Sequence, residues 1–200
     1  MRNVIFNSLA AGFLISIGGS VFLGCESKVV GAVLFTVALL TICKMKMYLF
    51  TGKIGFIAES FKKVDALHLV TGLLGNYVAA TLFGLMIKYA VPTSAEKALS
   101  ICEKKLTQAP LQTFILGIFC GALMYIAVKI YKENSISGII YCVPVFILAG
   151  FEHSIADMFY FAAGGLFNAK YVLFLVLVIL GNTVGGVIVP LFKRLAGADK

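Results

Sequence analysis

Residues Pro144 to Gly165, PVFILAGFEHSIADMFYFAAGG, place three ionisable side chains inside a mostly apolar stretch. Glu152, His153 and Asp157 fall within six positions of one another, and aliphatic, aromatic and small residues surround them. Inside a membrane, an ionisable side chain costs several kcal/mol unless it faces a cavity or a partner. We therefore expect this stretch to line a pathway or a binding site, and the rest of the chain to enclose it.

The composition is that of an all-α integral membrane protein. Hydrophobic residues make up 60% of the 200 residues and charged residues 13%, whereas soluble proteins carry roughly 25% charged residues. The net charge is +8, but lysine and arginine occur singly or in pairs between apolar runs and form no basic stripe with aromatic residues. We therefore expect the lipid bilayer, and no nucleic acid, as a partner.

Six apolar segments predict six transmembrane helices in a single domain that covers residues 1–200. The first segment begins almost at Met1 without a small-residue cleavage site, which favours a retained helix over a signal peptide. A polar connector, Pro92 to Thr107, follows the third segment. The segments are Val4–Leu23, Val29–Ile42 with a short second piece at Ile54–Phe61, Ala66–Val91, Pro110–Tyr131, the segment that contains Pro144–Gly165, and Tyr171–Phe192.

The second and fifth segments are interrupted, and they hold corresponding places in two three-helix halves, residues 1–91 and 110–200. Broken helices in matching places are typical of an inverted repeat with its pathway at the repeat interface. The interruptions are Lys44, Lys46 and the run Tyr48-Leu49-Phe50-Thr51-Gly52 in the second segment, and Gly150, Gly164 and Gly165 in the fifth.

The distribution of lysine and arginine favours one orientation. With six spans, both ends of the chain lie on one side of the membrane, and cytoplasmic loops are rich in Lys and Arg. We therefore expect both termini on the cytoplasmic side of the inner (plasma) membrane. That side collects Arg2, Lys53, Lys62, Lys63, Lys129, Lys132, Lys193, Arg194 and Lys200, and the other side collects Lys28, Lys88, Lys97, Lys104, Lys105 and Lys170.

Five cysteines lie mostly inside apolar runs and lack CxxC spacing; they are Cys25, Cys43, Cys102, Cys120 and Cys142. Such cysteines are typical of small packing residues rather than of metal or redox sites. Cys25 and Cys102 fall on the same side of the membrane in this topology, and the sequence leaves open whether they pair.

Four strings occur in order along the chain: LFTG at Leu49–Gly52, LLGNYVAA at Leu73–Ala80, GFEHSIADM at Gly150–Met158 and GNTVGG at Gly181–Gly186. Together they resemble the signatures of the formate/nitrite transporter family over essentially the whole chain. The resemblance implies a homopentamer with an aquaporin-like fold, in which each protomer holds its own pore for a small monovalent anion such as formate, nitrite or hydrosulfide. We expect no cofactor and no enzymatic activity.

The resemblance assigns pore roles to residues at both interruptions. His153 matches the central pore histidine, and Thr51 matches the threonine that faces it. Phe146, seven positions before His153, matches an apolar constriction on the outer side. Leu49 and Phe50 match the constriction on the inner side. The implied pathway therefore has a polar centre between two apolar constrictions.

Three further residues match the family by position. Lys105, twelve residues before Gly117, matches the vestibule lysine, and Lys104 beside it is the alternative register. A compact cation near a funnel raises the local concentration of anions, whereas the alternative for Lys105 is a solvated loop lysine. Asn76 and Asn182 match the asparagines of two Gly-Asn pairs, and we expect Asn182 to replace part of the hydration of a passing anion.

Two positions depart from the family pattern. Asp157 stands where the family usually has asparagine, so the sequence does not determine the charge state of the pore. Gly121 stands where many members have asparagine, so the sequence does not determine whether the pathway keeps that hydrogen-bond donor. Asp157 would share a face with His153 in a continuous helix, so we expect it to stabilise the imidazolium ion, unless a helix break removes the contact. The alternative is that Asp157 faces a neighbouring subunit or interfacial water.

Glu152, the other candidate modulator of proton coupling, is better explained as a hydrogen-bond acceptor at a broken helix end.

The resemblance and the chemistry of His153 imply a mechanism in three steps. Lysine and exposed backbone donors attract the anion, the apolar constrictions exclude water, and His153, Thr51 and Asn182 replace lost hydration. Burial disfavours imidazolium whereas an anion favours it, so His153 can titrate in the physiological range. A bare anion crosses an apolar ring at high cost, so transient protonation favours the anions of weak acids. The sequence leaves open the identity of the anion, and whether the protein is a channel or a proton-coupled carrier.

Other functions have weaker support. A membrane-embedded metalloenzyme would use Glu152, His153 and Asp157 with His68 as a further ligand, but the chain has only two histidines. A water or glycerol channel would carry paired Asn-Pro-Ala half-helices, which are absent from this sequence. Thr51 has the simpler alternative of capping a half-helix.

Overall fold

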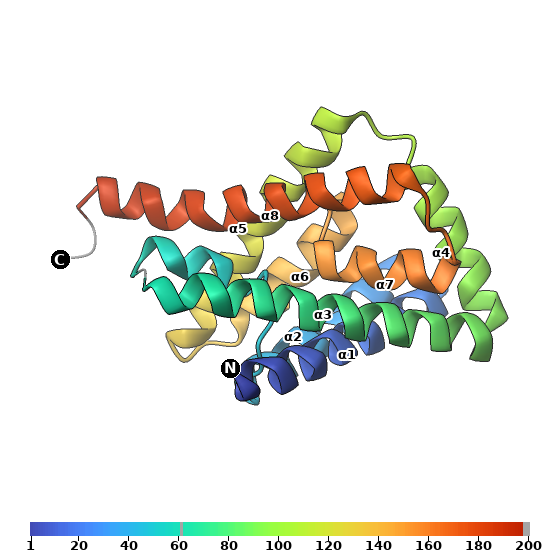
Figure 1. Ribbon diagram of the computed structural model, residues 1–200, viewed down its shortest axis with the longest axis horizontal. Coiled ribbons are helices and arrows are strands. Elements are labelled where there is room, and N and C mark those ends of the chain that lie inside the picture. Colours follow the sequence, from blue (N-terminus) through green and yellow to red (C-terminus); the bar gives the residue numbers. More distant parts are fainter. Residues whose placement is uncertain (61, 198–200) are drawn as a thin grey trace.

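Every secondary-structure element in the part of the chain that the structure describes is a helix. The computed structural model describes residues 1–60 and 62–197, so Phe61 and Lys200, which the sequence analysis used, lie outside the described residues. In chain order the elements are α1 (Arg2–Gly24), α2 (Lys28–Lys44), the 3₁₀ helix η1 (Ile54–Ala58), α3 (Lys63–Ala90), α4 (Pro92–Lys105), α5 (Pro110–Lys132), α6 (Ser137–Ala149), α7 (Ser154–Gly164) and α8 (Ala169–Leu195) (Figure 1).

Helix lengths divide these elements into full spans and half-spans. α1, α5, α8 and residues Val64–Ala90 of α3 are long and apolar enough to cross a membrane, and α6 and α7, bent by 52° at a short break, together make a fifth span. α2 has 17 residues, or about 26 Å of helix. This falls short of the ~30 Å hydrocarbon core, and a loop then leads to η1. The all-α fold with interrupted second and fifth segments is therefore confirmed.

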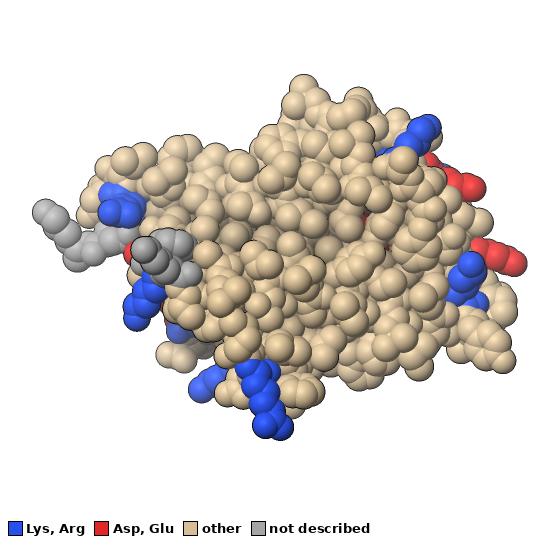
Figure 2. All heavy atoms as spheres, viewed as in Figure 1, with Lys and Arg blue, Asp and Glu red and all other residues tan. Residues whose placement is uncertain are grey.

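The long helices lie side by side, and one short helix crosses their end. α1 packs along α3, and α5 packs along α8. α4 lies at the end of the molecule opposite to the start of α1 and the end of α8, so we call these two ends the α4 end and the terminal end (Figure 1). On the face drawn in Figure 2, charged side chains gather toward the two ends and beside the start of α1, with an uncharged area between them. This distribution fits a bilayer around the middle of the helices.

Each interrupted segment ends against the other half of the chain. η1 packs on α8, and α7 packs on α3. α2 packs on α1 in the same way as α6 packs on α5. The two sets of helices thus repeat one pattern of contacts, and the second piece of each interrupted segment packs against the other set. This is expected of an inverted repeat. The division at residues 91 and 110 stays a prediction.

Asn76, buried on α3, braces the break that follows α2. Its Nδ2 donates to the carbonyl oxygens of Tyr48 at 3.0 Å and Ser8 at 2.8 Å. Its Oδ1 accepts the N–H of Phe50 at 2.9 Å. The side chain therefore satisfies the backbone groups that flank Leu49, which no helix satisfies at this point.

Asn182, buried on α8, performs the same task at the break between α6 and α7. Its Nδ2 donates to the carbonyl oxygens of Glu152 at 2.8 Å and Gly117 at 2.9 Å, and its Oδ1 accepts the N–H of Ser154 at 2.9 Å. In both halves the amide thus binds the residues before and after one central residue. That central residue is Leu49 in the first half and His153 in the second.

Glycines allow the helices to approach the two asparagines. A Cβ at Gly12 of α1 would crowd the backbone of Asn76, and a Cβ at Gly121 of α5 would overlap the backbone of Asn182. Gly117, one helical turn before Gly121, contacts Gly181 in the same way, because small residues let helices approach closely. The backbone of α8 occupies the space beside Gly121. An asparagine side chain, the hydrogen-bond donor that many family members have at this position, therefore would not fit here.

Local sequence explains where the fifth segment bends. Gly150 ends α6 in a left-handed conformation with φ of 74°, which glycine adopts without a steric penalty. Three residues later, His153 is extended, and its side chain caps α7 by accepting the N–H of Ala156. Gly165, with φ of 68°, ends α7. Of the glycines considered as break candidates, Gly150 is the one at the bend.

The predicted polar connector is itself a helix, α4. It begins with Pro92 in its first turn, where proline is tolerated. It buries one face, including Ala98 and Cys102, and packs against α7. Its last residue is Lys105, so α4 directs a cation over the break in the fifth segment. Cys25 and Cys102 are both free thiols.

Substitution of Asn182 tests whether its amide braces the break. Asn182→Ala leaves two buried carbonyl oxygens and one N–H without a partner, and each costs about 1–3 kcal/mol. We expect a loss of stability of about 3 kcal/mol or more, seen as a lower midpoint of thermal unfolding in detergent. Asn3→Ala, at an exposed position of α1, is the control and should change stability by less than about 0.5 kcal/mol. Equal midpoints for the two variants would contradict the bracing role.

Candidate functional site

The two interrupted segments meet through one buried hydrogen bond. Oγ1 of Thr51, in the break between α2 and η1, lies 2.9 Å from Nε2 of His153, in the break between α6 and α7. Thr51 is fully buried, and His153 is 3% exposed. The fold therefore brings together the two residues that the family resemblance paired, although they are 102 positions apart in the sequence.

The backbone of α7 selects one tautomer of His153. Its Nδ1 accepts the N–H of Ala156 at 3.1 Å, so Nδ1 carries no proton and the proton of the neutral ring lies on Nε2. We infer from this network that Nε2–H donates to the Thr51 hydroxyl oxygen. A second proton on Nδ1 would remove the helix cap, so the observed geometry fits neutral imidazole.

Phe146 covers the ring of His153. The two ring centroids are 5.5 Å apart, and the rings are inclined by 20° in a stacked arrangement. Phe35 of α2 meets Phe146 edge-on at 6.5 Å. Phe146 itself is 4% exposed. An aromatic wall of residues from both halves thus lies beside the imidazole.

A cavity of about 300 Å³ lies on the α4 side of this wall. We call it the α4-side cavity. Its lining is mostly aromatic and aliphatic, and the side chains of Phe146 and His153 form part of it. The charged side chains that line it are Lys28, Lys105 and Asp157. The imidazole is therefore accessible from a cavity that contains two cations.

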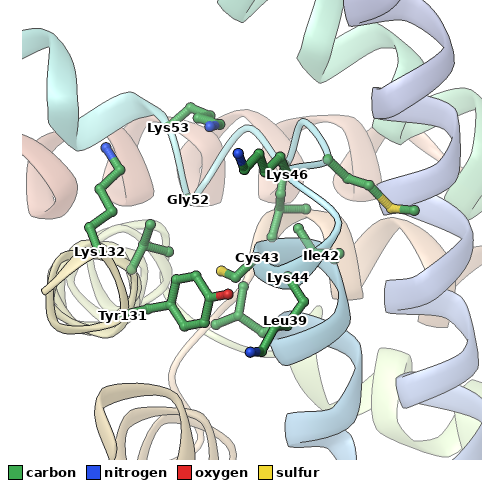
Figure 3. A pocket seen from close by; sticks show the side chains of 12 residues that line it. Leu39, Ile42, Cys43, Lys44, Lys46, Gly52, Lys53, Tyr131 and Lys132 are labelled. Atoms are coloured by element: carbon green, nitrogen blue, oxygen red, sulfur yellow. The ribbon is translucent and has the colours of Figure 1, made fainter. Parts of the chain in front are cut away.

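A second cavity, of about 350 Å³, opens toward the terminal end, and we call it the terminal-side cavity. Leu49 lines it and is 1% exposed, and the neighbouring Phe50 is 5% exposed. Tyr131 and Cys43 also line it, and Figure 3 shows lysines around them. These lysines come from the end of α2, the following loop and the end of α5, and they are Lys44, Lys46, Lys53 and Lys132.

Lys105 joins two buried carboxyl groups. Its Nζ forms ion pairs with Oε2 of Glu152 and, at 3.0 Å, with Oδ1 of Asp157. Oε1 of Glu152 accepts the side-chain amide N–H of Gln108 at 2.8 Å. The Lys105 side chain is 16% exposed, whereas Glu152 and Asp157 are 1% and 2% exposed. The cation of α4 therefore compensates charge next to the break.

The ammonium of Lys105 stays charged at physiological pH. Burial alone would lower its pKa, but the carboxyl groups of Asp157 and Glu152 raise the pKa above its ordinary value. Lys104 is exposed. Between the two registers that the sequence left open, Lys105 is thus the lysine that lines the same cavity as His153, and the alternative of a solvated loop lysine does not hold for it.

The positions of the two acidic residues differ from the sequence-based expectation. His153 precedes α7 as its cap, so Asp157 does not share a continuous helix face with it, and Oδ1 of Asp157 binds Lys105 instead of imidazole. Asp157 faces the protein interior rather than interfacial water. Glu152 was expected to accept a hydrogen bond at a helix end, but its carboxyl group pairs with Lys105 while its backbone carbonyl accepts from Asn182.

The asparagines also differ from expectation. Both amide hydrogens and the oxygen of Asn182 are used by the backbone, and the same holds for Asn76. They position Leu49 and His153 rather than replace the hydration of an anion. Sequence reasoning missed Gln108 at Glu152, since no local pattern marks it beyond its place three residues after Lys105.

The geometry does not support the metalloenzyme alternative. Both ring nitrogens of His153 have partners within the fold, and Glu152 and Asp157 bind the same ammonium group. His68 lines a different cavity, together with Asp65. Among the described residues, no three His, Cys, Asp or Glu side chains are grouped so that they could hold a metal ion.

Comparison with known sequences gives the family. The sequence model described as formate/nitrite transporter matches residues 1–194. The chain belongs to this family. The matched range includes both breaks, both bracing asparagines and the Thr51–His153 pair.

Known transporters and channels align with most of the chain at low identity. An uncharacterized transporter, YrhG, of Bacillus subtilis is 24% identical over 82% of this chain and 70% of its own length. The formate channel FocA of Haemophilus influenzae is 24% identical over 84% of this chain and 74% of its own. The nitrite transporter NirC of Salmonella typhimurium is 28% identical over 77% of this chain and 65% of its own.

Solved structures show the same fold. A pentameric formate channel with formate bound superposes with a TM-score of 0.79 over 99% of this chain and 98% of that chain, at 23% identity. An ion channel of the formate/nitrite transporter family superposes with a TM-score of 0.83 over 96% of this chain and 89% of that chain, at 22% identity. The fold of this family member is therefore the fold of these channels.

Removal of the Thr51 hydroxyl tests the hydrogen bond at the centre of the site. Thr51→Val keeps the side-chain shape but leaves Nε2–H of His153 without its acceptor, at a cost of about 1–3 kcal/mol in a buried site. We expect a corresponding fall in the thermal unfolding midpoint. Thr51→Ser keeps the hydroxyl and should remain closer to the wild type. If the valine and serine variants unfolded at the same temperature, this hydrogen bond would not be present.

Removal of the Lys105 ammonium tests the buried ion pairs. Lys105→Met removes the cation that both carboxyl groups bind and leaves the buried Glu152 carboxylate without its ion pair, and breaking a buried pair costs about 3–5 kcal/mol. The loss should be smaller at acidic pH, where protonation neutralises the remaining carboxylate. Lys104→Met, at an exposed position, should change stability by less than about 0.5 kcal/mol. Unfolding curves in detergent at neutral and acidic pH give the comparison, and a pH-independent loss would contradict this account.

Proposed function

We propose that this chain forms a transmembrane channel or transporter for small monovalent anions of weak acids. The observation that carries the proposal is the buried Thr51–His153 hydrogen bond, which lies between two lysine-containing cavities at opposite ends of the fold. Membership of the formate/nitrite transporter family supports the same function.

Lysines provide the attraction at both ends of the pathway. Lys28 and Lys105 line the α4-side cavity, and four lysines line the terminal-side cavity. Charges of one sign around a cleft raise the local concentration of the opposite ion, and the effect falls with ionic strength. An anion is thus concentrated before it meets the apolar part of the pathway.

The apolar part of the pathway separates ions from neutral acids. Phe146 lies against the His153 ring in the lining of the α4-side cavity, and Leu49 stands on the terminal side. A bare anion loses hydration at such a constriction at high cost, whereas its neutral acid loses little. This difference favours anions that can accept a proton, and it links transport to pH.

His153 and Thr51 give the centre of the pathway its polar contacts. The Thr51 hydroxyl can rotate away from His153, so that Nε2–H donates to a small anion instead, while Nδ1 remains bound to the backbone of α7. The proposal therefore needs no movement of the bracing asparagines.

Formate and nitrite, for which the relatives FocA and NirC are named, are the first candidate substrates. Hydrosulfide is a third, because it is also small, monovalent and the anion of a weak acid. The proposal includes protons as co-substrates and contains no enzymatic step.

We extend the proposal to assembly and location. The pentameric neighbour supports a homopentamer in which each protomer has its own pore. Val70, Leu74, Val78 and Leu82 of α3 are more than half exposed and follow one another at helical spacing. Such an apolar face suits lipid or a neighbouring subunit. We place the protein in the inner (plasma) membrane with both termini on the cytoplasmic side, as the lysine and arginine distribution predicts.

Flux into liposomes tests this function. Purified protein is reconstituted, and the uptake of formate, nitrite, hydrosulfide and chloride is measured across pH. We expect saturable uptake of at least one weak-acid anion that rises with acidity and exceeds chloride uptake. His153→Ala should lower it by about tenfold, the effect of roughly 1.4 kcal/mol on the barrier.

The control for that variant is His68→Ala, which removes the other histidine and lies outside the pathway. It should transport like the wild type. Folded, oligomeric protein without flux above that of empty liposomes would overturn the proposed function.

A further inference from the structure

Asp157 has one carboxyl oxygen without a partner. Oδ1 binds Lys105 at 3.0 Å, whereas Oδ2 is buried and has no hydrogen-bond partner among the described residues. The residue is 1% exposed and lines the α4-side cavity together with His153. Buried polar atoms are nearly always paired, so an unpaired carboxyl oxygen beside a cavity calls for an explanation.

Charge balance around Lys105 points to a bound proton. Glu152 and Asp157 both bind the same ammonium group, so they are close neighbours, and one cation cannot neutralise two carboxylates. Two carboxyl groups that share a buried site do not both ionise readily. A net negative charge at this point would also repel the anions that the cavity admits. One additional proton removes both difficulties.

Asp157 is the group best placed to hold that proton. Both oxygens of Glu152 already accept hydrogen bonds, from Lys105 and Gln108, which suits a carboxylate. Nδ1 of His153 is occupied by the Ala156 N–H. Oδ2 of Asp157 is the position without a hydrogen-bond partner, and the residue lines the α4-side cavity, where an entering anion can act as the acceptor.

We propose that Asp157 is the proton donor of the α4-side cavity: it carries a proton on Oδ2 and gives it to a weak-acid anion that enters beside His153. The inference rests on the proposed function and adds a residue and a step to it. The Asp157 O–H bond breaks, and a bond forms between that proton and an oxygen or sulfur atom of the anion. The products are a neutral acid and the Asp157 carboxylate, which takes a proton again from water on the α4 side. The cycle moves one anion together with one proton.

Other titratable groups around Asp157 set the conditions for this step. α4 contributes Lys105 and Cys102, the α6–α7 break contributes Glu152 and His153, and α7 contributes Tyr160. Cys120 of α5 and Tyr171 of α8 also interact with it electrostatically, and Lys28 of α2 lies across the same cavity. Lys105 is the cation in direct contact, and it remains to pair the carboxylate after the proton has left.

Infrared spectroscopy tests the protonation without any substrate. A protonated carboxyl group has a C=O stretching band that carboxylates lack, and we expect this band in the wild type at neutral pH. It should shift when aspartate is labelled with ¹³C, stay when glutamate is labelled, and disappear in Asp157→Asn. Labelling uses the wild-type protein, so the test does not depend on the folding of a variant. Absence of the band, or a shift only with labelled glutamate, would overturn the assignment.

Formate flux tests the transfer step. The Asp157→Asn substitution keeps the size of a protonated aspartate but leaves no proton to give, so we expect this variant to transport about tenfold less than the wild type at acidic pH, the effect of roughly 1.4 kcal/mol on the barrier. At alkaline pH the order should reverse, because the wild type then carries a second carboxylate, at Asp157, beside that of Glu152, and it repels the anion. The two pH profiles should cross near the pH at which the infrared band titrates. Parallel or coincident profiles would overturn the proton-donor role.

Glu103→Gln is the matched control. Glu103 is an exposed carboxyl group of α4, two residues from Lys105, and its removal should leave the formate profile unchanged. The two proposals fail separately. A protonated Asp157 in a protein without flux would contradict the proposed function alone, whereas pH-dependent flux without the infrared band would contradict the proton donor alone.

Discussion

Two buried asparagine amides hold the irregular backbone on which the rest of the site depends. Helices satisfy their own N–H and C=O groups, but a break inside an apolar fold exposes groups that neither lipid nor an apolar neighbour can satisfy. Asn76 and Asn182 each supply two donors and one acceptor to the flanks of a single residue. They leave the side chains of Leu49 and His153 free to face the pathway. The fold thus uses the same device twice and places an apolar residue in one copy and a titratable one in the other.

His153 combines a structural and a chemical task. Its Nδ1 caps α7, so the ring is fixed by the same bond that starts the helix, and its Nε2 is left for Thr51 and for the pathway. A histidine with one nitrogen bound to the backbone has a defined tautomer and a defined direction of donation. The precision of the polar centre therefore comes from the break in the helix rather than from a dense network of side chains.

The buried charges near His153 are organised from outside the interrupted segment. α4 is amphipathic and packs on α7, and Lys105 at its end binds two carboxyl groups and supplies the positive charge at this depth. The helix spacing of Asp157 from His153 suggested a direct contact. The break rotates His153 out of the helix, and the contact goes to Lys105. Helical spacing does not predict which residues are in contact across a break in the helix. The same sequence nevertheless correctly indicated that the fifth segment is interrupted.

The sequence by itself determined the all-α membrane fold, the two interrupted segments and the pairing of His153 with Thr51, because these follow from long-range hydropathy, glycine placement and motifs that lie at the breaks. Only the tertiary structure decided what Asn76, Asn182 and Asp157 do. Their roles depend on which atoms from distant segments reach them. The two amides form all their hydrogen bonds with backbone groups of other segments, and one oxygen of the Asp157 carboxyl group binds the lysine at the end of α4. Only the tertiary structure likewise shows why residue 121 is glycine: the backbone of α8 lies against it and leaves no space for a side chain. Hydropathy and motifs determine which residues are buried near the pathway, whereas hydrogen bonds between distant segments decide which of their polar atoms remain available to an ion.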